Sequence, residues 1–187
     1  MVNRIIGVFR LDVNTFEEIE HDESATVQAA IIVAIVAVLA GAGGFIAANS
    51  VGQLAGFIEG LEGAGEFVVP QMNPVGAAIS AIINTFIGWF VWSGLTFFVG
   101  TNMFGGKATM GEMLRVIGFS MAPRFLQIIP CVGWIGWIWA LVAGFIGIRQ
   151  GLDLDNGKTA LTILISIAGY WVVSFIISLI LTPIFGL

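Results

Sequence analysis

The sequence predicts an all-α integral membrane protein, a five-transmembrane-helix bundle with its N-terminus in the cytoplasm and its C-terminus outside. Composition is the first reason: of 187 residues, 58% are hydrophobic and 10% are charged, whereas soluble domains carry about 25% charged residues. Length is the second reason, because a helix needs about 20 apolar residues to cross a bilayer. Apolar stretches of about that length cover residues 26–48, 75–99, 110–129, 132–148 and 159–181.

The positions of the basic residues give the orientation. The loop 49–74 and the tail after residue 182 hold no Lys or Arg, so the positive-inside rule places both of them outside. Arg124 alone is left over, inside the third span. The other six basic residues fall on the predicted cytoplasmic side: Arg4, Arg10, Lys107, Arg115, Arg149 and Lys158.

Residues 1–25 are predicted to be a cytoplasmic interfacial segment with a short helix on the inner membrane surface. Asn14 or Thr15 can cap this helix. Phe16 and Ile19 then lie on an apolar side. The alternative is a solvated tail that only keeps the N-terminus inside. The opposite, polar side of the helix carries Glu17, Glu18 and Glu20.

Two local patterns add to the outline. Thr109 and Glu112 fit a capping box, which starts the third span. In the outer loop, apolar residues recur at helical spacing and predict a short amphipathic helix on the outer face. Those residues are Leu54, Phe57, Ile58 and Leu61.

The third and fourth spans are predicted to form a tight hairpin. Pro123 lacks a backbone N–H and is expected to kink the third span, and Pro130 ends it. Trp134 and Trp137 follow the turn and are typical of the aromatic belt at a membrane interface.

Arg124 marks a candidate intramembrane polar site. At ~1.5 Å per residue it lies roughly 22 Å along the helix from Thr109, past the midplane of a core about 30 Å thick. Its expected partners are Asn84 at a similar depth, the carbonyl freed near Phe119, the outer-loop glutamates or a lipid phosphate. Alternatively, Arg124 only snorkels to the outer headgroups. The candidate site consists of Asn84, Ser120, Pro123, Arg124 and Gln127.

The fifth span carries small or hydroxyl-bearing residues every four positions. Hydroxyl groups find no hydrogen-bond partner among lipid tails, so this stripe is predicted to face other helices or a cavity. This candidate helix-packing stripe consists of Ser166, Tyr170, Ser174 and Ser178.

No catalytic, cofactor-binding or metal site is predicted, and the protein is not expected to be an enzyme. The segment 157–159 reads Gly-Lys-Thr but lacks the preceding glycine of a P-loop, and 153–157 lacks the Glu of a calcium loop; a turn that caps the last helix is expected instead. His21 and Cys131 each stand alone. No basic run indicates nucleic-acid binding.

Several segments together resemble the Yip1 domain family, in its prokaryotic form. They are Gly106-Lys107-Ala108-Thr109, then Leu114-Arg115-Val116-Ile117-Gly118-Phe119-Ser120-Met121-Ala122-Pro123, then Gly147-Ile148, then Gly157-Lys158-Thr159-Ala160. The stretch 4–19 is similar to the lead-in of prokaryotic members. The residues that match family positions are Gly118, Pro123, Gly147 and Lys158.

The resemblance implies a five-helix membrane domain over residues 26–187, with a cytosolic N-terminus. Eukaryotic members of the family act at endoplasmic reticulum and Golgi membranes, where they bind Rab GTPases and partner family members in vesicle traffic. This chain lacks their long polar N-terminal region, which argues against a Rab-type GTPase partner. It favours the cytoplasmic membrane of a bacterium or archaeon.

Two functional hypotheses follow. The leading one is a non-enzymatic membrane protein that organises membrane protein or lipid partners through helix–helix contacts, related to trafficking or membrane organisation. Its expected partners are the bilayer, other membrane proteins or a second copy, and an anionic lipid. The alternative is a permease or lipid-translocating protein with a polar path around Arg124.

Overall fold

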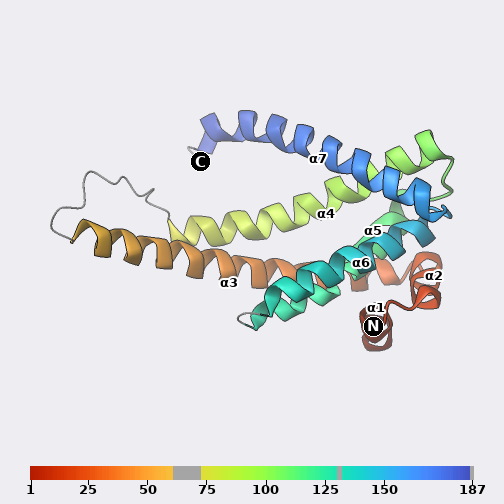
Figure 1. The fold of residues 1–187 in the computed structure, drawn as a ribbon, viewed down its shortest axis with the longest axis horizontal. Helices are drawn as coiled ribbons and strands as arrows, with labels where there is room; N and C mark the ends of the chain where they lie inside the picture. Colours follow the sequence, from red (N-terminus) through yellow and green to blue (C-terminus); the bar gives the residue numbers. More distant parts are fainter. Residues whose placement is uncertain (61–72, 130–131, 186–187) are drawn as a thin grey trace.

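The computed structural model describes residues 1–60, 73–129 and 132–185, and within these ranges every regular element is a helix (Figure 1). The prediction of an all-α protein is confirmed. In chain order the elements are α1 (Val2–Phe9), α2 (Val13–His21), α3 (Ala25–Glu59), α4 (Pro74–Phe104), α5 (Met110–Ser120), the 3-10 helix η1 (Ala122–Ile128), α6 (Gly133–Gly151) and α7 (Asn156–Phe185).

Three of these helices, α3, α4 and α7, are long and apolar enough to cross a membrane. They correspond to the first, second and fifth predicted spans. Small residues bring α3 and α4 close together: a Cβ atom on Gly44 would lie 3.0 Å from the carbonyl oxygen of Ala77, and one on Gly41 3.2 Å from that of Ala78. The two helices therefore pack almost backbone to backbone.

The predicted outer amphipathic helix is not a separate element. Instead α3 continues without a break to Glu59, because residues 49–59 contain no proline that would interrupt the backbone hydrogen bonds. Ala55 in this extension is buried. Leu61, the last residue of the predicted helix, lies outside the described residues.

The third predicted span is likewise not one α-helix. The helix α5 ends at Ser120, and the backbone bonds then change to three-residue spacing: the N–H of Met121 donates to Gly118 (3.2 Å) and that of Arg124 to Met121 (3.0 Å). Pro123 has no N–H to continue the α-helical bonding. The expected kink is thus a change of helix type. As predicted, α5 and η1 form a hairpin with α6.

The N-terminal residues form two helices rather than one. Arg4 on α1 forms ion pairs with Glu18 (2.8 Å) and Asp22, which tie α1 to α2. The cap of α2 is Asp12, whose carboxylate accepts a hydrogen bond from the N–H of Asn14 (3.1 Å). The predicted cap at Asn14 or its neighbour was therefore wrong by two residues or more.

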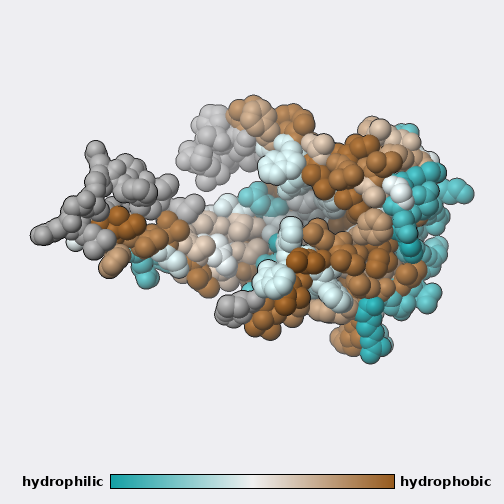
Figure 2. Space-filling model, viewed as in Figure 1, coloured by the Kyte–Doolittle hydropathy of each residue, from teal (hydrophilic) through white to brown (hydrophobic). Residues whose placement is uncertain are grey.

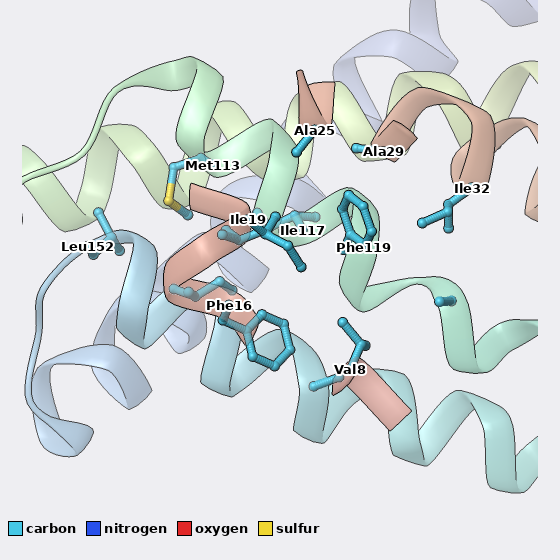
Figure 3. Close-up of a cluster of buried hydrophobic side chains, with 14 of the residues drawn as sticks. Val8, Phe16, Ile19, Ala25, Ala29, Ile32, Met113, Ile117, Phe119 and Leu152 are labelled. Atoms are coloured by element: carbon cyan, nitrogen blue, oxygen red, sulfur yellow. The ribbon is translucent and has the colours of Figure 1, made fainter. Parts of the chain in front are cut away.

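The apolar side of α2 packs against protein. Phe16 and Ile19 are fully buried and point into a cluster with Met113 and Phe119 of α5 (Figure 3). The apolar face assigned to the membrane surface is thus covered by α5 and α6. Glu20, predicted on the polar side, is only 6% exposed.

The loops at one end of the molecule contact one another. The N–H of Lys107 donates to the carbonyl of Leu152 (3.0 Å), and the side chain of Gln150 donates to the carboxylate of Glu17 (2.9 Å). The first bond joins the α4–α5 loop to the α6–α7 loop, and the second joins α2 to the end of α6. Figure 2 shows hydrophilic side chains gathered at this end, with hydrophobic side chains over much of the remaining visible surface.

Candidate functional site

A crevice of about 400 Å³ opens between α4, α5, η1, α6 and α7. Aromatic side chains from three helices contribute to its walls, including Trp89 and Trp92 from α4, Trp137 from α6 and Tyr170 from α7. The indole N–H of Trp89 donates to the carbonyl of Leu114 (3.0 Å). Trp92 and Tyr170 meet edge to face with their ring centroids 6.2 Å apart, an arrangement that aromatic pairs favour. These contacts hold the walls in place.

Arg124 reaches the crevice from η1. Its Nε atom is buried and has no hydrogen-bond partner among the residues that the structure describes. None of the residues lining the crevice is an Asp or a Glu. A guanidinium group in such apolar surroundings is costly unless it is paired, so the crevice presents an uncompensated positive charge.

The structure brings only part of the candidate polar site together. Ser120 lines the crevice with Arg124, but its hydroxyl lies 2.6 Å from the carbonyl oxygen of Val116 and is already occupied. Pro123 is buried within η1. Gln127 is half-buried and does not contribute to the lining.

Asn84 is exposed on α4 and is not part of the lining. It lies one helical turn beyond Gly88, on the same side of the helix. Neither Asn84 nor the carbonyl of Phe119 forms a hydrogen bond with Arg124 in the described part of the chain. Of the outer-loop glutamates, Glu62 and Glu66 lie outside it, as does the side chain of Glu59.

The predicted site omitted the aromatic walls. Trp89 and Trp92 are three residues apart and so lie on one side of a helix, and Tyr170 belongs to the predicted packing stripe. The signal was therefore present within each span. What the sequence could not provide was the contact between α4 and α7 that turns these residues toward one another.

The packing stripe on α7 lies partly between helices. Ser166 is fully buried, Tyr170 lines the crevice, and Ser174 is half-buried. The side chain of Ser178 lies outside the described set. Three buried hydroxyl groups have no hydrogen-bond partner among the described residues, those of Ser93, Thr162 and Ser166.

Comparison with known families decides the identity. Residues 6–179 match the Yip1 domain. The chain belongs to the Yip1 domain family. This family is implicated in membrane trafficking and is generally non-enzymatic, and the long apolar helices mark this member as an integral membrane protein. No curated protein and no solved structure matches the chain significantly.

Two of the positions that carried the resemblance to the Yip1 domain are glycines at close helix contacts. A Cβ atom on Gly118 would lie 2.8 Å from the Cβ of Ala29 on α3. One on Gly147 would lie 2.9 Å from the hydroxyl of Ser120 and 3.3 Å from the ring of Phe16. Both positions leave little room for a side chain, because protein interiors are close-packed.

The segment before α7 of the Yip1 domain is a capping turn. The carboxylate of Asp155 accepts hydrogen bonds from the N–H groups of Gly157 (2.9 Å) and Lys158 (3.0 Å). The capping turn expected here is confirmed. Lys158 itself is exposed.

A second polar cluster lies where α2 meets α5. The buried guanidinium of Arg115 donates to the carbonyl of Glu20 through Nε (3.0 Å) and Nη2. The side-chain carboxyl of Glu20 takes no part in these hydrogen bonds, and its Oε2 atom is buried without a partner in the described residues. Burial raises the pKa of Glu20 to about 7; His21 opposes this shift, and Glu17 among other carboxylates adds to it.

We expect the stability of the protein to fall between pH 4.5 and about 7. In this window the folded protein keeps a proton on Glu20 that the unfolded chain has already released, so rising pH favours unfolding. Glu20→Gln should remove this component, so its unfolding temperature should fall less between about pH 5 and about pH 8 than that of the wild type. Thermal unfolding in detergent at both pH values measures it.

The control for this prediction is Glu23→Gln, which changes an exposed carboxyl near the same helix. It should keep the pH dependence of the wild type. An unfolding temperature that responds to pH equally in wild type and Glu20→Gln would contradict the prediction.

Proposed function

We propose that this Yip1 domain protein organises membrane-embedded partners by lateral contact, without catalysing a reaction. The observation that carries the proposal is the exposed apolar surface on the C-terminal half of α7. Figure 1 shows the C-terminal half of α7 running apart from α6. Large apolar side chains on this half are exposed, including Trp171 at 73%. Such surfaces suit partners within the bilayer.

A five-span topology in the cytoplasmic membrane of a bacterium or archaeon is part of this proposal. The hairpin of α5, η1 and α6 would supply the third and fourth spans. Its α6 arm has 19 residues, about 28 Å at 1.5 Å per residue, close to the thickness of a bilayer core. The hydrogen bonds between the loops gather the segments that carry most basic residues at one end, which supports a common cytoplasmic side.

The alternative, a permease or lipid-translocating protein, has less support. A polar path would need Asn84 and Gln127 in line with Arg124. In the structure neither residue lines the crevice, and most of the lining is aromatic or aliphatic. The polar side chains on such a path would be Arg124, Tyr170 and a Ser120 hydroxyl that is already bonded.

Partner capture tests the proposed function. A photo-crosslinking residue replaces Trp171 on the exposed face of α7, and a matched variant carries it at Asp153 in the polar loop. After irradiation in native membranes and extraction into nanodiscs, mass spectrometry identifies the adducts. We expect one reproducible membrane-protein adduct, another protein or a second copy, at Trp171 and not at Asp153.

Two outcomes would contradict the proposal. The first is a wild-type protein that purifies as a monomer with no specific adduct at either position. The second is flux of anions or lipids through liposomes containing the wild-type protein, which would favour the permease alternative.

A further inference from the structure

We propose that the crevice is a binding site for an anionic phospholipid, with the lipid phosphate on Arg124 and an acyl chain along the aromatic walls. The proposal rests on the proposed function, since it names one class of membrane partner and the place where it binds. Charge, wall chemistry and free space each support it.

Charge selects an anion. Arg124 has no counter-charge among the described lining residues, and its Nε atom is shielded from solvent. The oxygens of a phosphate, like those of a carboxylate, match the planar, forked donors of a guanidinium group, often through two parallel hydrogen bonds, and phosphate is the anionic group of membrane phospholipids. A bound phosphate would satisfy the buried donor that the protein leaves unpaired.

The walls select an amphipathic ligand over a free anion. Apart from Arg124, the crevice is lined mainly by indole, phenyl and aliphatic groups, which gain little from an inorganic ion. Its volume of about 400 Å³ is within the range of sites that hold organic ligands. Besides Arg124 and the already bonded Ser120 hydroxyl, the lining includes the hydroxyl of Tyr170. It forms no hydrogen bond with the described residues, so it can donate to a lipid ester oxygen.

The position of Arg124 suits a headgroup. Four residues, 125–128, separate it from the end of η1, about 8 Å at 2.0 Å per residue. Trp134 and Trp137 are exposed at the same end of the hairpin, where tryptophans are typical of the membrane interface. A long Arg side chain covers much of this distance by snorkelling.

Free space in the crevice comes from Gly144 on α6. A Cβ atom at this position would meet no atom within 4 Å, although Gly144 belongs to the lining. A larger side chain can therefore leave the α6 backbone at Gly144 without an immediate clash, and we expect it to occupy crevice space. This gives a variant that blocks the site and leaves Arg124 intact.

The test measures lipid retention. The full chain is purified in detergent with equal amounts of phosphatidylglycerol, which is anionic, and phosphatidylcholine, which is zwitterionic. Native mass spectrometry then counts the lipids that remain bound. We expect selective retention of phosphatidylglycerol, and a loss of about tenfold or more in Arg124→Gln, because a hydrogen bond to a charged group is removed.

Two further variants separate binding from folding. Gly144→Phe should lose phosphatidylglycerol with an unchanged unfolding temperature, and Arg124→Lys should keep part of the selectivity because it keeps the charge. Arg10→Gln, which removes an exposed charge outside the crevice, should bind as the wild type does.

Two lipid results would overturn the proposal: equal retention of both lipids by the wild type, or unchanged retention in both Arg124→Gln and Gly144→Phe. Displacement of the lipid by inorganic phosphate at millimolar concentration would also overturn it, because it would indicate a site for a free anion. Failure of the lipid site is distinguishable from failure of the proposed function, because partner capture at Trp171 is measured on the outward face of α7.

Discussion

Gly136→Ala is expected to lower the free energy of unfolding by about 1–3 kcal/mol, the range measured for overpacked interiors. Gly136 is a point of close contact between α6 and η1: a Cβ atom here would lie 2.5 Å from the carbonyl oxygen of Pro123 and 3.0 Å from the Cβ of Leu126. The nearest atom belongs to the backbone of a proline, so it cannot move aside as a side chain does. The hairpin arms must separate.

Equilibrium unfolding in mixed micelles measures this effect. Gly144→Ala is the matched control, because it makes the same change on the same helix where a Cβ meets nothing within 4 Å. It should be neutral or slightly stabilising, since alanine restricts the unfolded chain more than glycine does. Equal stabilities of the two variants would show that the α6–η1 contact is looser than the structure indicates.

Arg115→Met should detach the N-terminal helices from the rest of the protein. The Arg115 guanidinium donates twice to the carbonyl of Glu20 and once, at 3.4 Å, to the hydroxyl of Thr26. Its positive charge also lies at the C-terminal end of α2, where it stabilises the helix dipole. We expect a loss of about 2–3 kcal/mol, because the hydrogen bonds involve a charged group.

Hydrogen exchange gives the decisive measurement for Arg115→Met. Residues 13–24 should exchange much faster than in the wild type, while α3 and α4 keep their protection, because the broken contacts lie at one end of the bundle. Arg10→Met removes an exposed positive charge from the neighbouring turn and should leave the exchange unchanged. Uniform loss of protection along the chain would mean that α1 and α2 do not open separately.

The sequence predicted the long helices well because their signal is local. Hydropathy over about 20 residues is enough to find α3, α4 and α7, and the capping box of Thr109 and Glu112 is present at the start of α5. Pro123 signalled a break, since its missing N–H is a property of a single residue. Whether the chain would bend or rewind into a 3-10 helix depended on the packing of α6 against it.

Long-range contacts explain what the sequence could not predict. Phe16 and Ile19 are as apolar as an interfacial helix requires, and no local pattern shows that α5 and α6 would cover them. Glu20 was assigned to the polar side by helical periodicity, yet Arg115, 95 residues away, holds it in the interior. In the same way, Arg124 was found as an unusual charge, but its aromatic surroundings come from three other helices.

The burial of α1 and α2 against the hairpin sets an order for folding during synthesis. The indole of Trp139 donates to the carbonyl of Phe9, a separation of 130 residues. At a synthesis rate of about 5–20 residues per second, Trp139 is synthesised roughly 6–26 seconds after Phe9. Until then, α1 and α2 cannot form their contacts with α6. These two helices therefore leave the ribosome well before the hairpin on which they pack, and their apolar face is uncovered by native contacts during that interval.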